Sequence, residues 1–153
     1  MRWQIVEDDL CGPEIRALLQ QHFAGMLANS PAGSCHFLDF DGLTADGVGF
    51  WSIWLSGELA GCGALKRIDP DHGEIKSMRV ADAFRGRGAG YAMLQHILAE
   101  ARGRGLSRLS LETGSGPAFA DAAQLYVRAG FSDCAPFGDY RADPFSRFMT
   151  LAL

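Results

Sequence analysis

The stretch RVADAFRGRGAGYAML, residues 79–94, constrains the chain most, because three glycines and two arginines at 85–90 separate a predicted strand from a predicted helix. A helix normally begins after a capping Ser, Asp or Asn, with acidic residues in its first turn. This helix has neither, so its N–H groups and its dipole form a potential anion site. Arg85 and Arg87 add forked donors suited to phosphate oxygens. The stretch predicts a phosphate-binding turn; a flexible, solvated turn is the alternative.

The turn matches neither of two common phosphate-binding motifs, which excludes the ligands that those motifs bind. A dinucleotide fingerprint requires G-x-G-x-x-G, but Tyr91 or Met93 stands where the third glycine would be. A Walker A loop requires G-K-[ST], which is absent. A nucleotide-phosphate transferase would also need a catalytic Lys or metal-binding carboxylates near the turn, and none is evident.

Apolar periodicity around the turn predicts the order βα–βββ–α–β–α–ββ, a mixed α/β sandwich in a single domain, residues 1–153. The predicted strands are 2–7, 73–80, 106–113 and 146–153, with a hairpin of 49–56 and 59–68. The predicted helices run from Pro13 to about 28, from the end of the glycine stretch to about 104, and from Pro117 to about 129.

Composition excludes several classes of protein. A formal net charge of −4 and a pI near 5.5 argue against nucleic acid as a partner. No stretch is long and apolar enough to span a membrane, and the N-terminus lacks a signal-peptide core. We therefore expect a cytoplasmic protein with reduced thiols and no metal, because its cysteines and histidines show no ligand spacing: Cys11, Cys35, Cys62, Cys134, His22, His36, His72 and His96.

Three spaced motifs resemble those of the GNAT N-acetyltransferases. Residues 85–90, RGRGAG, resemble the family's R/Q-x-x-G-x-G/A motif; residues 57–69 and 74–80 resemble its central hairpin and fourth strand; and residues 122–131, AAQLYVRAGF, resemble its last helix. The resemblance is strongest to a bacterial subgroup with poorly defined substrates. It implies the acyl-CoA N-acyltransferase fold, a mostly antiparallel sheet with helices on both faces, and acetyl-CoA as cosubstrate.

The resemblance also implies where acetyl-CoA binds. In this family the fourth strand splays from the fifth, and its free backbone groups bind the pantetheine arm; the matching residues are Met78, Arg79 and Val80. The pyrophosphate is expected on the turn, at Arg85, Gly86, Arg87, Gly88, Ala89, Gly90 and Tyr91. One position departs from the pattern, because Phe119 stands where many relatives carry an Asn that contacts pantetheine.

Acetyl transfer to an amine requires a base and benefits from an acid. An alkylamine with a pKa near ~10 must lose a proton before it attacks, and the departing thiolate gains from a donor. Tyr126 matches the family's tyrosine donor; packing in the core is its alternative. Glu74 is the first expected base, because residues 74, 76, 78 and 80 should share one strand face, and Glu112 is the second. Pairing with Lys or Arg, such as Lys76, is the alternative for both.

The acceptor is not identified by these motifs. Acidic residues would favour an amine and Arg141 a carboxylate, which together suggest an amino-acid-like acceptor. We expect transfer to a primary amine of a small molecule by direct attack in a ternary complex; the alternatives are a protein or peptide amine, or a non-catalytic CoA-binding sensor. A homodimer is only a family tendency. Candidate pocket residues are His36, Phe37, Asp39, Asp41, Trp51, Trp54, Tyr140 and Arg141.

Overall fold

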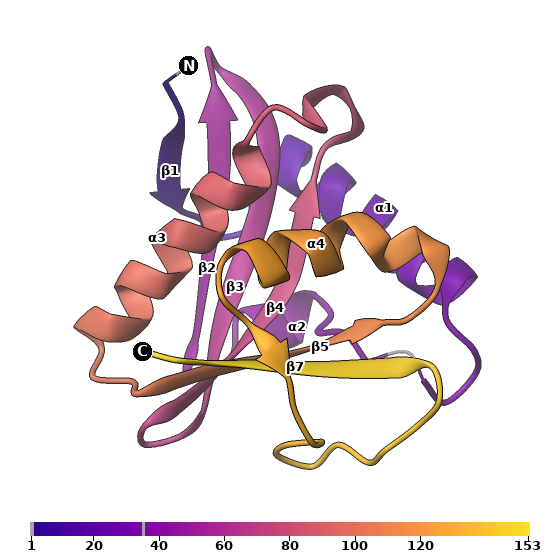
Figure 1. The fold of residues 1–153 in the computed structure, drawn as a ribbon. Coiled ribbons are helices and arrows are strands. Elements are labelled where there is room, and N and C mark those ends of the chain that lie inside the picture. The colour runs from indigo at the N-terminus through magenta and orange to yellow at the C-terminus, as the bar shows by residue number, and fades with distance from the viewer. Residues whose placement is uncertain (1, 35) are drawn as a thin grey trace.

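The computed structural model describes residues 2–34 and 36–153 as a seven-stranded sheet flanked by helices (Figure 1). The sheet has the order β1-β2-β3-β4-β5-β7-β6, and its pairs are antiparallel except for β4 with β5. The elements are β1 (Gln4–Glu7), α1 (Pro13–Asn29), α2 (Phe40–Leu43), β2 (Val48–Leu55), β3 (Glu58–Asp69), β4 (His72–Val80), α3 (Ala89–Gly103), β5 (Arg108–Gly114), α4 (Ala120–Arg128), β6 (Ser132–Asp133) and β7 (Ser146–Ala152), with single 3₁₀ turns at Asp82–Phe84 and Pro117–Phe119.

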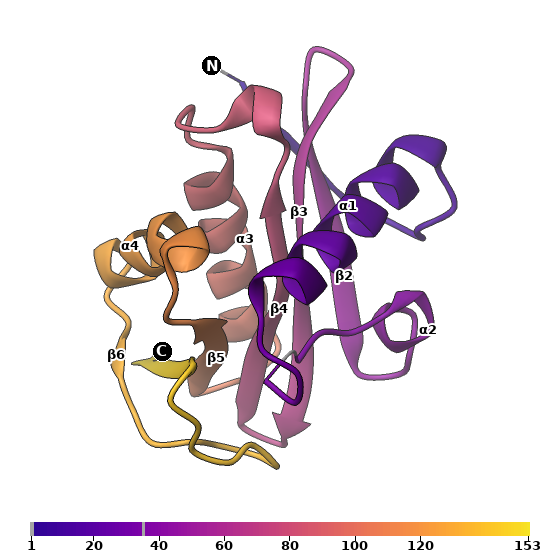
Figure 2. The ribbon, with the colours of Figure 1, turned by 90° about the vertical axis from the view of Figure 1, so that its right-hand side faces the viewer.

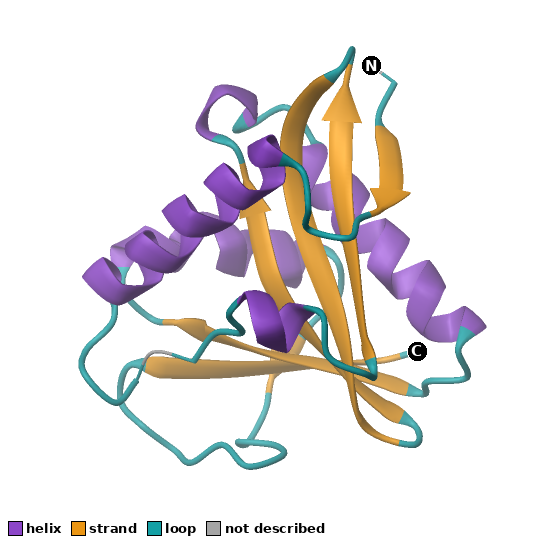
Figure 3. Cartoon of the chain, turned by 180° about the vertical axis from the view of Figure 1, so that it is seen from behind, coloured by secondary structure: helices purple, strands orange, loops and turns teal. Residues whose placement is uncertain are grey.

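The helices form two layers, with α1 and α2 on one face of the sheet and α3 and α4 on the other, as the edge view in Figure 2 shows. Each layer buries its own apolar cluster. Leu19 of α1 packs with Cys62 and Ala64 of β3, whereas Leu94 and Ile97 of α3 pack with the opposite face. Figure 3 shows α1 and α2 from their own side of the sheet. The predicted mixed α/β fold with helices on both faces is confirmed.

The sheet opens between its two parallel strands. β4 pairs with β5 only from His72 to Glu74, opposite Arg108 to Ser110, and the rest of the two strands is unpaired. In Figure 1, β5 and β7 accordingly run across the direction of β2, β3 and β4. We call this opening the fork. It leaves backbone groups of β4 free of ladder hydrogen bonds, so a ligand can use them.

A bulge in β4 reorients the side chains that reach the fork. Cys62 pairs with Arg79 but Ala64 pairs with Lys76, so two residues of β4 oppose one of β3. Ser77 takes up the extra residue with a positive φ of 55°, a conformation uncommon for a residue with a Cβ. The bulge shifts the alternation of side chains by one residue.

The predicted elements agree with the structure in type and order. The helix predicted from Pro117 begins as a 3₁₀ turn and becomes α-helical at Ala120.

Within the described residues, no helix combines the length and the apolar character needed to cross a membrane. Cys11, Cys62 and Cys134 are free thiols, and Cys35 lies outside the described residues.

Candidate active site

A cleft of about 620 Å³ runs through the fork from one helical layer to the other. α1, β4, the glycine turn, β5 and α4 all contribute to its lining. Its charged lining residues are mostly basic, although the chain as a whole carries a formal net charge of −4. This excess of positive charge favours an anionic ligand. The charged residues that line it are Lys76, Arg79, Arg85, Arg128, Glu112 and Asp121.

The glycine turn leads into α3 at one end of the cleft. Gly86 and Gly88 have φ values of 71° and 95°, which glycine adopts without strain. Gly88 is the N-cap of α3; no side chain caps the helix, and its first turn holds no acidic residue. The helix N-terminus is therefore open to the cleft, which Gly86, Gly88, Ala89, Gly90 and Tyr91 line.

The two arginines of the turn behave differently. Arg85 lines the cleft and lies 3.7 Å from the carboxylate of Asp82. Arg87 lies with its guanidinium 4.9 Å from the ring centre of Phe84 and is not among the described residues that line the cleft. Arg85 is thus the better placed of the two to contact a bound phosphate.

The bulge separates the three β4 residues that were expected to bind pantetheine. Met78 lies against Gly63 and the α3 residues Met93 and Ile97, and Val80 also packs on that side. Arg79 instead shares a face with Lys76 and Glu74, toward α1. The expectation that residues 74, 76, 78 and 80 share one face is therefore wrong, because the inserted residue at Ser77 inverts the alternation.

Tyr126 lies at the α4 side of the fork. Its side chain lines the cleft, is 5% exposed, and packs edge-on against Phe131 with ring centres 5.8 Å apart. Burial raises the pKa of the Tyr126 hydroxyl above its usual value, which keeps the proton on the oxygen. The residue is both a core packing residue and a protonated donor facing the cleft. Phe119 also lines the cleft and is held edge-on by Phe145.

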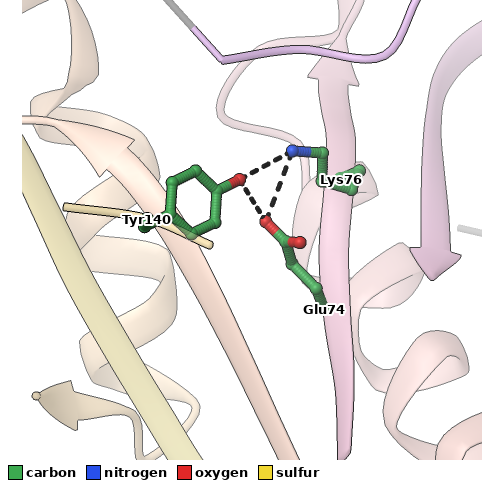
Figure 4. Close-up of polar contacts among 3 residues, drawn as sticks. All are labelled: Glu74, Lys76 and Tyr140. Carbon is green, nitrogen blue, oxygen red and sulfur yellow. Dashed lines mark hydrogen bonds and ion pairs between the residues drawn. The ribbon is translucent and has the colours of Figure 1, made fainter. Parts of the chain in front are cut away.

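Glu74 is held in a compact polar cluster (Figure 4). Its Oε2 atom accepts a hydrogen bond from the Tyr140 hydroxyl at 2.5 Å and from Lys76 Nζ at 3.3 Å, and Lys76 also donates to Tyr140 at 2.8 Å. Glu74 is 4% exposed and is not among the described residues that line the cleft, whereas Lys76 is. The carboxylate thus has the pairing with Lys76 that was the alternative to catalysis.

Glu112 lies on the same face of the sheet, on the other side of the fork. Its strand neighbour Ser110 pairs with Glu74, so strand alternation puts both carboxylates toward α1. Glu112 lines the cleft, and burial raises its pKa, with Ser146, His36 and Lys76 opposing the rise. A carboxylate with these properties suits a general base.

The loops near Glu112 hold two of the expected acceptor residues. His36 and Phe37 line the cleft, and His36 packs edge-on against Tyr140, 5.2 Å away. The Ser34 hydroxyl donates a hydrogen bond to the Asp143 carboxylate at 2.5 Å, which joins the loop after α1 to the loop before β7. Among the described residues, the cleft lining does not include the other candidates: Asp39, which caps α2; Asp41, Trp51 and Trp54 of the α2 and β2 region; and Tyr140 and Arg141.

A family model supports the interpretation of this geometry. Residues 14–131 match the model of the acetyltransferase (GNAT) family, which covers more than half of the chain. The chain belongs to the GNAT family.

The relatives of this GNAT protein carry consistent names. It is 50% identical over 149 residues to the uncharacterized N-acetyltransferase YedL of Escherichia coli, covering 97% of this chain and 94% of the relative. It is 48% identical over 146 residues to the uncharacterized N-acetyltransferase YsnE of Bacillus subtilis, covering 95% of this chain and 97% of the relative. Family and relatives together identify an acyltransferase.

Solved structures share the fold. A Klebsiella pneumoniae protein provisionally named an acyl-CoA N-acyltransferase superposes with a TM-score of 0.80 at 28% identity, over 99% of this chain and 97% of that one. A GNAT acetyltransferase from Elizabethkingia anophelis, solved with acetyl-CoA bound, has a TM-score of 0.69 at 17% identity, over 99% of this chain and 98% of that one.

Several cleft residues of this GNAT protein carried no recognisable signal in the sequence. His22, Gly25, Met26 and Asn29 all come from α1, whose periodicity indicated only a buried face. Lys76 was considered only as a partner of Glu74. Strand alternation alone would put the side chain of Arg79 on the face opposite Glu74, because the bulge has no signal in the sequence.

We expect Glu74 and Lys76 to depend on each other for stability. Lys76→Met should lower the free energy of unfolding by about 3 kcal/mol, because it leaves a buried carboxylate without its cation. The double variant Glu74→Gln/Lys76→Met should recover most of that loss. Urea denaturation of the wild type, both single variants and the double variant measures the coupling. Additive losses would show that the pair is not energetically coupled.

Proposed function

We propose that this GNAT protein transfers an acetyl group from acetyl-CoA to the primary amine of a small molecule, by direct attack in a ternary complex. The observation that carries the proposal is the fork, which joins an open helix N-terminus and a buried tyrosine on one side of the sheet to a carboxylate on the other. The E. anophelis neighbour with bound acetyl-CoA supports the choice of cosubstrate.

Acetyl-CoA fits the α3 and α4 side of the cleft. The pyrophosphate would accept hydrogen bonds from backbone N–H groups of Gly86 to Tyr91, and Arg85 would add charge. The pantetheine would run along the unpaired edge of β4 near Met78, where the ladder to β5 has ended. Phe119 would contact that arm by packing, in place of the hydrogen bond that an Asn would make.

The two sides of the fork would divide the chemistry. As the amine nitrogen forms its bond to the thioester carbon, the carbon–sulfur bond breaks, the surplus amine proton passes to the base, and the thiolate takes a proton from the acid. We assign the acid to Tyr126 and the base to Glu112, directly or through a water. Glu74 would orient Lys76 and Tyr140 instead, because it is buried and both donors already bind its Oε2 atom.

Cosubstrate binding should depend on the electrostatics of the glycine turn. Acetyl-CoA at 100 times its Kd should stabilise the protein by roughly 2.7 kcal/mol, measured as a rise in Tm. Gly88→Asp should lose that rise, because it puts a negative charge beside the bound pyrophosphate. Gly88→Asn is the matched control: it has the same shape and tolerates the positive φ equally well, and it should retain most of the rise. Equal shifts in both variants would place the phosphates elsewhere.

Turnover should depend on the Tyr126 hydroxyl. Tyr126→Phe preserves the packing against Phe131 but removes the donor, so kcat should fall by about 10²-fold while acetyl-CoA affinity is unchanged. Stopped-flow measurement of CoA release and calorimetric titration of acetyl-CoA separate the two quantities. Wild-type turnover with chemistry rate-limiting would make Tyr126 a packing residue only.

The acid limb of the pH profile should belong to Glu112. Because burial raises its pKa, the carboxyl takes up a proton earlier than usual as the pH falls, and kcat/KM should fall with it. Glu112→Gln should lower kcat/KM at neutral pH and remove this limb, with partial recovery at high pH, where more amine is unprotonated. Glu74→Gln should keep the limb. The reverse result would make Glu74 the base.

A further inference from the structure

Arg79 places a guanidinium in the cleft on the α1 side of the sheet. The bulge at Ser77 turns its side chain away from α3 and toward Gly25 of α1, where an added Cβ would lie 3.7 Å from an Arg79 terminal nitrogen. The side chain is 22% exposed and lines the cleft. It therefore lies on the same face as Lys76 and Glu112, opposite the glycine turn's helix.

The donors of Arg79 are poorly satisfied. Its Nε atom is buried and has no hydrogen-bond partner among the described residues. The nearest carboxylate oxygen, on Asp82, is 3.9 Å from a terminal nitrogen; Asp82 is 64% exposed, and its other oxygen accepts from Gln21. A part-buried guanidinium with unmatched donors costs free energy that a bound anion would recover.

The polar neighbours of Arg79 do not compensate its charge. Burial, with a contribution from the guanidinium itself, lowers the pKa of His22 to about 4, so this cleft residue is neutral at pH 7. Burial raises the pKa of the Cys62 thiol to about 12, so it stays protonated. The Ser77 hydroxyl, which also faces the cleft, is buried without a partner in the described chain. Among the described residues, the one carboxylate within 4 Å of Arg79 is therefore Asp82, which is exposed and also pairs with Arg85. The buried surroundings add a free hydroxyl but no further anion.

The geometry points to a carboxylate of the acceptor as the missing anion: we propose that Arg79 binds it and that the acceptor is an amino acid or a similar amine that carries a carboxylate. The proposal rests on the function proposed above. The phosphates of acetyl-CoA have their own site at the glycine turn on the other face, and Lys76 already shares its protons with Glu74 and Tyr140. Arg128, the remaining basic residue of the cleft, belongs to α4 and lies over the Tyr91 ring, so on the α1 side Arg79 is the lining cation left for the acceptor.

The same face also provides the other end of such a molecule. Glu112 lies across the fork, where it can take the amine proton, and Arg79 lies toward α1, where its forked donors suit both oxygens of a carboxylate. An acceptor with both groups would be fixed at two points, which orients its nitrogen toward the thioester. A simple alkylamine would be held at one point only and would leave Arg79 unpaired.

The test compares amino acids with their carboxamides in a CoA-release assay at saturating acetyl-CoA. The pair keeps the side chain and the amine and differs in the charge that Arg79 would bind. The amide has the less basic amine, so intrinsic reactivity favours it at neutral pH. We expect kcat/KM for the acid of the best pair to exceed that for its amide by about 10²-fold or more. Equal values, or a preference for amides, would overturn the proposal and leave the acetyltransferase function intact.

Variants assign the preference to Arg79. Arg79→Gln should bring kcat/KM for the acid down to the amide's value, leave that for the amide unchanged, and preserve acetyl-CoA affinity. Arg102→Gln, at an exposed position on α3, is the control for loss of one positive charge. Equal losses with both acceptors, accompanied by weaker acetyl-CoA binding, would assign Arg79 to the cosubstrate and overturn the proposal.

Failure of the underlying function would be recognised separately. If the wild type binds no acetyl-CoA and releases no CoA with any amine, both proposals fall together. If Arg79→Gln does not fold, the acid–amide comparison on the wild type still decides the matter. Competition by an acid that lacks the amine adds a second readout: it should inhibit with respect to the acceptor and leave acetyl-CoA binding unchanged. No inhibition at concentrations far above the acceptor KM would contradict a carboxylate site.

Discussion

The loss of pairing between β4 and β5 is the constraint on which the site depends. A parallel ladder that continued past Glu74 and Ser110 would close the cleft and satisfy the backbone groups of β4. The ladder ends where β5 and β7 turn across the other strands (Figure 1), and α4 together with His36 and Phe37 lines the opening. The fold thus leaves unpaired, partly buried backbone of β4 in the cleft, where a ligand or water must complete its hydrogen bonds.

The bulge at Ser77 gives this opening two chemically different sides. It directs Met78 and Val80 into the layer of α3, beside Tyr126, and directs Arg79 into the layer of α1, beside the face that carries Lys76 and Glu112. A donor for a leaving group and a base for an incoming amine must approach a carbonyl from different directions. In the proposed mechanism the fork provides this separation, because it lies between Tyr126 of α4 and Glu112 of β5, and the bulge adds side chains of β4 to both sides.

The sequence predicted the elements and the glycine turn because both depend on local patterns. Gly86 and Gly88 occupy positive φ, and the uncapped N-terminus of α3 follows from the absence of Ser, Asp and Asn there. The face of each β4 residue could not be predicted, because it depends on a register shift against β3 that no local pattern encodes. Trp51 shows the same limit: alternation placed it on a strand face but could not tell the core beside His96 from the acceptor pocket.

The central claim is that the fork places the sulfur of CoA between the two layers, with Tyr126 on one side. A crystal structure of the protein with CoA tests this most directly. We expect the pyrophosphate on the N–H groups of residues 86–91, the pantetheine along the unpaired edge of β4, and the sulfur within hydrogen-bond distance of the Tyr126 hydroxyl. Two results would contradict the account: CoA bound outside the fork, or β4 and β5 paired along their full length so that the fork is closed.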